Sequence, residues 1–114
     1  MRPSSPLSVP VYHVLLALGD EVLHGYGMMR RFEELTGGAD QLLAGTLYST
    51  LARMVELGLI EEARAPSGDQ SGGPSRRHYR VTSRGRALAR TESERLRRLV
   101  DVARRRTWLP GMAR

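Results

Sequence analysis

Arginine is the residue type with the clearest chemistry in this sequence. The 114 residues include 18 basic residues, all of them Arg, and 12 acidic residues, so the formal net charge is +6. Fourteen of these arginines fall in residues 64–114, together with only four acids. A guanidinium group donates paired hydrogen bonds to phosphate and carboxylate oxygens. Although single arginines can be plain solvated cations, the basic second half predicts a polyanionic partner, most often a nucleic acid.

No arrangement typical of a catalytic or metal site accompanies the arginines. The sequence has no Cys, and its three histidines, His13, His24 and His78, are not spaced like metal ligands. No nucleophile with a neighbouring base and no phosphate-binding loop is recognisable. We therefore expect no enzyme, no cofactor and no metal. The lack of Cys suits a reducing cytosol, and no apolar run is long enough to span a membrane, so a cytoplasmic protein is expected.

Three helices are predicted in the first half of the chain. The first begins at Ser8, a plausible N-cap, and stops at Gly19. The second runs from about Gly25 to Thr36, where its apolar residues share one face. The third lies within GTLYSTLARMVELGLI at 45–60. The first helix is hydrophobic on almost every side and should be buried, whereas the second and third each have one apolar face.

The third helix should present a polar face. Its apolar residues repeat at helical spacing: Leu47, Leu51, Met54 and Val55. Thr46 is expected to start the helix, and Gly58 is expected to close it with a left-handed cap. The opposite face carries side chains able to meet base edges or phosphates: Thr46, Tyr48, Ser49 and Arg53. The alternative is an ordinary amphipathic core helix.

A hairpin and a long helix follow. Strands are expected at 59–64 and 77–82, joined by a Gly-, Pro- and Ser-rich segment at 65–75 that forms the hairpin tip. A last helix should run from Thr82 or Ser83 to about Leu109, roughly 40 Å, which is longer than the domain's own core requires. Its apolar stripe, interrupted by Glu92, comprises Leu88, Ala89, Leu96, Leu99, Val100, Ala103 and Thr107.

This order of elements predicts a mainly helical fold with a small β-hairpin, a winged helix-turn-helix followed by one long helix. In such a unit the third helix, the reading helix, enters the major groove of DNA, and the hairpin, the wing, contacts the flanking DNA backbone. Arg53 is the only cation on the third helix and suits a guanine or a phosphate. Arg76 and Arg77 suit backbone or minor-groove contacts. Arg53 can instead pair with a nearby glutamate, and Tyr48 can instead pack under the wing.

Three segments make the sequence resemble the PadR family of bacterial transcriptional regulators: LHGYG at 23–27, GTLYSTLARMVELGLIEE at 45–62 and RRHYRVTSRGRAL at 76–88. The resemblance covers nearly all of residues 7–100 and is to short members with a single C-terminal helix. It implies a homodimer that binds an inverted repeat in double-stranded DNA, usually as a repressor. It also implies that small, often aromatic molecules release some members from DNA.

The resemblance further implies roles for individual residues. Residues matching the reading helix and the basic wing strand should face DNA, and they are Thr46, Tyr48, Ser49, Arg76 and Arg77. Gly25 should allow close packing, while Tyr26 should anchor the first helix or touch a phosphate. The last helix should cross its mate and the first helix, with contacts from Leu88, Leu96, Leu99, Val100 and Ala103. Trp108 is expected at that interface, with stacking on a flat ligand as the alternative.

The expected organisation has four parts. A flexible tail at 1–7 precedes the winged DNA-binding domain at 8–82, which is followed by the dimerisation helix at 83–109 and a short tail at 110–114. The alternative function is a winged-helix module that binds proteins without specific DNA binding. The acidic first half and the single Arg on the third helix support that alternative.

Overall fold

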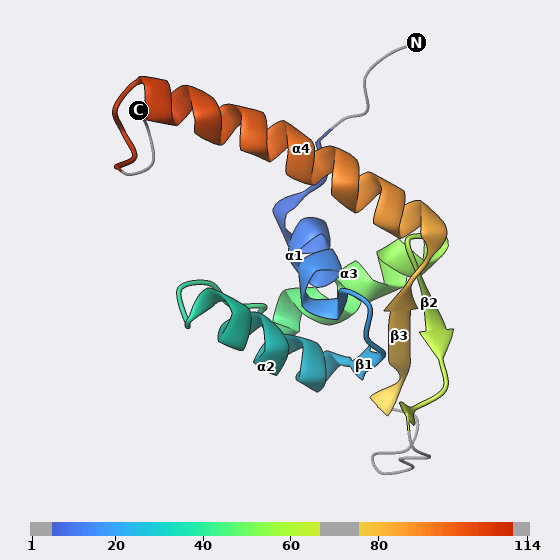
Figure 1. Cartoon of the computed structure of the whole chain (residues 1–114). Helices are drawn as coiled ribbons and strands as arrows, with labels where there is room; N and C mark the ends of the chain where they lie inside the picture. Colours follow the sequence, from blue (N-terminus) through green and yellow to red (C-terminus); the bar gives the residue numbers. More distant parts are fainter. Residues whose placement is uncertain (1–5, 67–75, 111–114) are drawn as a thin grey trace.

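Figure 1 shows the computed structural model, which describes residues 6–66 and 76–110. The elements are α1 (Val9–Leu18), β1 (Leu23–His24), α2 (Gly25–Thr36), α3 (Ala44–Glu56), β2 (Ile60–Ala63), β3 (His78–Val81) and α4 (Ser83–Arg105). This confirms the predicted mainly helical fold with a small hairpin and a long last helix. No helix in the described ranges combines the length and apolar character needed to cross a membrane.

The first two helices begin and end where the sequence predicts. The Ser8 side chain caps α1 by accepting a hydrogen bond from the Val11 amide at 3.4 Å. At α2 the cap is His24, whose Nδ1 accepts from the Gly27 amide at 2.9 Å. Gly37 then ends α2 in the left-handed conformation, with φ of 64°.

Helix α3 begins two residues earlier than predicted, so the assignment of Thr46 as its start is wrong. The carbonyl of Leu43 accepts the amides of Thr46 and Leu47 at 3.0 and 2.9 Å. Because this end has no side-chain cap, the sequence carries no capping signal there. The predicted end is confirmed: Gly58 has φ of 76°, and the Leu59 amide donates to the Met54 carbonyl at 2.9 Å.

The sheet has three strands in the described residues rather than the predicted two. The extra strand, β1, pairs antiparallel with β3 through Leu23 and Tyr79, and β3 lies between β1 and β2. A strand of two residues is too short to show alternation in the sequence. The strands β2 and β3 are each shorter than predicted, and residues 67–75 of the predicted hairpin tip at 65–75 lie outside the described residues.

The core lies between α1, α2, α3 and the start of β2. Its buried apolar residues are Val14, Leu15, Ala17, Leu18, Met28, Phe32, Leu42, Leu47, Leu51, Met54, Leu59 and Ile60. Helix α1 contacts α2, α3 and α4, so it is the element around which the others pack. Burial of its apolar side chains removes them from water and fixes α3 against the domain.

Helix α4 is joined closely to the end of α3. The Thr82 hydroxyl accepts from the Gly85 amide at 3.0 Å and donates to the Gly58 carbonyl at 2.6 Å. The helix is about 35 Å long at 1.5 Å per residue, and it crosses α1 so that its last turns project past the core (Figure 1). It ends before the predicted Leu109, because Thr107 adopts φ of 63° and the Trp108 amide donates to the Ala103 carbonyl.

Glu92, which interrupts the apolar stripe of α4, is the one buried charged residue of the described chain. Its side chain is 7% exposed, and Arg95 donates to its two carboxylate oxygens at 3.0 and 2.6 Å. These hydrogen bonds, with one from the Leu7 backbone, hold the pKa of Glu92 below its ordinary value of 4.5. The carboxylate therefore ties α4 to the segment that precedes α1.

Glu92→Gln is expected to lower the free energy of unfolding at neutral pH by about 1–2 kcal/mol, because charge-assisted hydrogen bonds are lost. Since the pKa of Glu92 is lower when folded, its contribution is complete above the ordinary value of 4.5 and disappears as pH falls. Urea unfolding at several pH values should therefore show the two proteins converging in acid. A gap that stays constant down to acid pH would contradict this role, and Glu33→Gln, at an exposed position, is the control.

Candidate nucleic-acid interface

Helix α3 presents the predicted polar face to solvent. Leu47, Leu51 and Met54 are buried and hold the helix on the core. The exposed residues of the helix are Ala44, Gly45, Thr46, Tyr48, Ser49, Ala52, Arg53, Val55 and Glu56. Val55, predicted to belong to the buried apolar stripe, is 42% exposed. All four predicted contact residues of the helix are therefore exposed on one element.

Tyr48 lies across the start of α2. A Cβ built on Gly25 would come within 2.8 Å of the Tyr48 hydroxyl and 2.9 Å of a ring carbon. Gly25 thus allows the close packing that the sequence predicts for it. The Tyr48 side chain is 51% exposed, so it is available for contacts rather than buried under the wing.

Gly25→Ala is expected to displace the Tyr48 ring, because the added methyl group would overlap it. The ring is the free end of a side chain, so the fold should keep its stability to within about 1 kcal/mol. Binding to a preferred DNA sequence should weaken by about tenfold, within the 1–3 kcal/mol span of one base contact. Chemical shifts of the Tyr48 ring and titrations with labelled DNA would measure both effects.

The control for this change is Gly27→Ala, two residues further along α2. A Cβ there has ordinary contacts, at 3.5 Å from the nearest atoms. It should leave both the ring and DNA binding unchanged. Equal effects from the two changes would mean that Tyr48 does not depend on Gly25.

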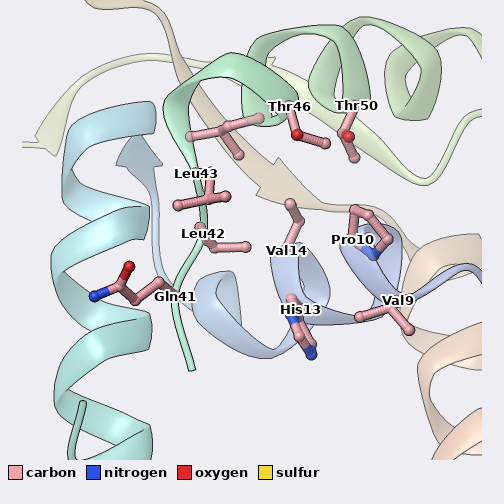
Figure 2. A pocket seen from close by; sticks show the side chains of 10 residues that line it. Val9, Pro10, His13, Val14, Gln41, Leu42, Leu43, Thr46 and Thr50 are labelled. Atoms are coloured by element: carbon pink, nitrogen blue, oxygen red, sulfur yellow. The ribbon is translucent and has the colours of Figure 1, made fainter. Parts of the chain in front are cut away.

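Thr46 lies on the opposite flank of α3, toward α1. It lines a cavity of about 170 Å³, together with Val9, Pro10, His13, Val14, Gln41, Leu42, Leu43, Leu47 and Thr50. Figure 2 shows Thr46 and Thr50 on the α3 side of this cavity, across from Val14 and Pro10 of α1. The two predicted base-reading side chains, Thr46 and Tyr48, therefore lie on different sides of one helix.

Ser49 and Arg53 occupy the exposed face between these flanks. The Ser49 hydroxyl donates to the Thr46 carbonyl at 3.0 Å, which leaves its oxygen free to accept a further hydrogen bond. Within residues 6–66 and 76–110, no ion pair involves Arg53, so the alternative that it pairs with a nearby glutamate, Glu56 or Glu33, is not observed there. Its guanidinium is a donor without a carboxylate partner in that part of the chain.

The wing arginines have neighbours on two elements. Arg76 Nη1 lies 3.4 Å from His24 Nε2, at the start of α2, and Arg77 Nη1 lies 3.9 Å from Glu62 Oε2 on β2. Burial raises the pKa of Tyr79, and the Glu62 carboxylate raises it further. His24 and Glu62 are therefore site residues that the sequence pattern did not predict. The N-cap position of His24, directly before Gly25, was the signal that could have found it.

Tyr26 lies at the surface of α2. It is 53% exposed, and the guanidinium carbon of Arg30 lies 6.0 Å from the ring centre. The ring is therefore accessible to a phosphate. Its contact with a phosphate, like its predicted anchoring of the first helix, stays a prediction.

The predicted interface residues of α4 fall into two groups. Leu88 packs partly against the chain's own core, and Leu96 is half-buried. Farther along, the apolar side chains are more exposed, and they are Leu99, Val100, Val102, Trp108 and Leu109. On the same stretch Arg97 and Arg104 pair with acids of the helix itself. The projecting half of α4 thus has an apolar surface that its own domain does not cover.

Comparisons with known proteins place this geometry in a family context. Residues 14–91 match the model of the Transcriptional regulator PadR-like family. A PadR family transcription regulator from Clostridium difficile has a TM-score of 0.69 at 21% identity, with 86% of this chain and 97% of that chain covered. A transcriptional regulator from Clostridium thermocellum has a TM-score of 0.65 at 22% identity, with 85% of this chain and 87% of that chain covered. A search of curated proteins found no match.

A third structure is Bacillus subtilis PadR in complex with operator DNA, with a TM-score of 0.62 at 22% identity. The alignment covers 76% of this chain and 47% of that chain, so this chain matches about half of that protein. Similarity at these identities shows a common fold. That fold is the winged helix with a long last helix that the sequence predicts.

Proposed function

The chain belongs to the PadR-like family of transcriptional regulators, and on this premise we propose that it is a homodimeric repressor that binds an inverted-repeat operator. The family consists of transcription regulators rather than enzymes. The observation that carries the proposal is the exposed polar face of α3, with the arginines of the wing beside it.

Direct contacts are assigned by the chemistry of each side chain. Tyr48, Ser49 and Thr46 would meet base edges, and Arg53 would meet a guanine or a phosphate. Arg76 and Arg77 suit the backbone, because guanidinium groups bind phosphate oxygens in pairs. The operator complex of Bacillus subtilis PadR, a protein of the same fold, supports DNA binding by this chain.

The exposed apolar surface of α4 and the residues after it supports the proposed dimer. The exposed apolar side chains of Leu99, Val102 and Trp108 would be covered by a second copy, whose α4 crosses the first. Two-fold symmetry then sets two α3 helices about one helical turn apart, roughly 34 Å, on the same side of the duplex. A palindromic operator is the counterpart of this symmetry.

Trp108 is the candidate residue for an effector. Its side chain is 77% exposed at the end of α4, and an indole ring can stack on a flat molecule. We propose a small aromatic effector that binds next to Trp108 and releases the protein from DNA. Quenching of Trp108 fluorescence by aromatic acids, with loss of DNA binding at the same concentrations, would support it, whereas quenching alone would not.

Selection of bound fragments from random duplexes tests the proposal most directly. A homodimeric regulator should enrich inverted repeats whose half-site centres lie about 10 base pairs apart. A sedimentation experiment on the same sample should give a dimer. A monomer that enriches no sequence, and binds no better than a generic polycation, would favour the protein-interaction module instead.

A further inference from the structure

We propose that Glu62 is a specificity-determining residue that competes with DNA phosphate for Arg77 and so limits sequence-independent binding. The inference rests on the proposed function, because it concerns the same surface. It assigns a role to a carboxylate placed among residues that would contact a polyanion.

The position of Glu62 follows from the register of the sheet. Glu62 lies opposite Tyr79, whereas Glu61 lies opposite Arg80. Since side chains alternate along a strand, Glu62 shares the face of Tyr79 and Glu61 lies on the other face. The two adjacent glutamates therefore point to different sides of the wing.

Tyr79 links Glu62 to the reading helix. Burial is the main cause that raises the pKa of Tyr79; the charge of Glu62 raises it further, the guanidinium of Arg77 lowers it, and Tyr48 raises it. Because Glu62 lies opposite Tyr79 and 3.9 Å from Arg77, these three residues form a cluster, and Tyr48 is near enough to act on Tyr79. Arg77 and Glu62 are both largely exposed, so a duplex that reaches Tyr48 can also reach them.

The ion pair between Arg77 and Glu62 is weak enough for a DNA phosphate to replace the carboxylate at Arg77. Its atoms are 3.9 Å apart and exposed, and pairs of this kind add little to stability. A phosphate that approaches Arg77 offers the same oxyanion chemistry as the carboxylate. When Arg77 turns to the phosphate, the Glu62 charge remains beside it and repels it.

This repulsion should act most strongly on non-specific complexes. Binding to random DNA comes almost entirely from phosphate contacts, and such complexes can shift along the duplex to optimise them. An operator complex also has base contacts by α3, which fix its register. Removal of the Glu62 charge should therefore strengthen random binding more than operator binding.

Glu62→Gln tests this role, with the full chain and a random duplex of about 30 base pairs at two salt concentrations. Affinity for the random duplex is expected to rise about three- to tenfold at moderate salt, as expected for one removed charge at this range. The dependence of affinity on salt should become steeper by up to about one unit. Operator affinity should rise less, so that the ratio of the two affinities falls. An unchanged random affinity would overturn the inference.

Glu61→Gln is the matched control, because it removes the same charge from the next residue, whose partner is Arg80 at 2.8 Å. It should have a clearly smaller effect, and an equal gain would mean that only net charge matters. In an Arg77→Ala background, the gain from Glu62→Gln should be clearly smaller, because the competition for Arg77 is absent, and a full gain there would also overturn the inference. If the unchanged protein binds no duplex at all, the proposed function fails. If it binds normally while Glu62→Gln changes nothing, only this inference fails.

Discussion

Gly85→Ala is expected to lower the free energy of unfolding by about 3 kcal/mol or more, enough to unfold much of a small domain. A Cβ on Gly85 would overlap the Leu59 carbonyl oxygen and would lie 2.9 Å from Val81 Cγ1. The carbonyl belongs to the backbone where α3 leads into β2, and it also accepts the Thr82 amide at 3.0 Å. No side-chain rotation can relieve this overlap. Urea unfolding followed by circular dichroism would measure the loss.

Gly45→Ala is the control for Gly85→Ala, since it makes the same change in another helix. Nothing lies within 4 Å of a Cβ built on Gly45. Because alanine favours helix over glycine, this variant should gain up to about 1 kcal/mol. If the free energy of unfolding of Gly85→Ala lay within 1 kcal/mol of that of the unchanged protein, the close packing of α4 on Leu59 would be contradicted.

Replacement of both Arg76 and Arg77 by Ala is expected to weaken DNA binding by about 10- to 100-fold at moderate salt, for operator and random duplexes alike. Each lost phosphate contact removes about one unit from the slope of log affinity against log salt, so the slope should fall by up to about two units. Fluorescence anisotropy over a series of salt concentrations would give both quantities.

Arg97→Ala with Arg98→Ala is the charge-matched control. These arginines are exposed on α4 and face Glu94 of the same helix. The control should keep most of the salt dependence. If the slope of log affinity against log salt were unchanged in the Arg76 and Arg77 variant, the wing would not be part of the DNA interface. If only the affinity for the operator fell, these residues would contribute to sequence recognition.

The sequence predicts those helix ends that are marked by a side chain or a glycine. Ser8 and Gly37 carry such marks, so the start of α1 and the end of α2 are predicted correctly. The start of α3 depends only on the Leu43 carbonyl, and the end of α4 on a left-handed Thr107. Backbone-only capping and a non-glycine residue with positive φ leave no sequence signal.

Some features of the candidate site can be predicted from the sequence, and others depend on contacts between elements that are separate in the sequence. The exposure of Tyr48, Ser49 and Arg53 follows from helical spacing alone, because the buried stripe determines the opposite face. The pairing of Glu62 with Arg77 depends on strand register across a hairpin of many residues. The packing of Tyr48 on Gly25 joins two helices, and spacing within one helix cannot reveal it.

The joint at Thr82 and Gly85 has a mechanical consequence. The Thr82 hydroxyl donates a hydrogen bond to the Gly58 carbonyl, and the backbone of Gly85 packs closely on the backbone of Leu59. We therefore expect α4 and the end of α3 to behave as one rigid unit. In the proposed dimer, the angle at which two such units cross would fix the distance between the reading helices. A molecule bound at the far end of α4 would therefore change how well the two α3 helices fit the duplex, without itself contacting the DNA.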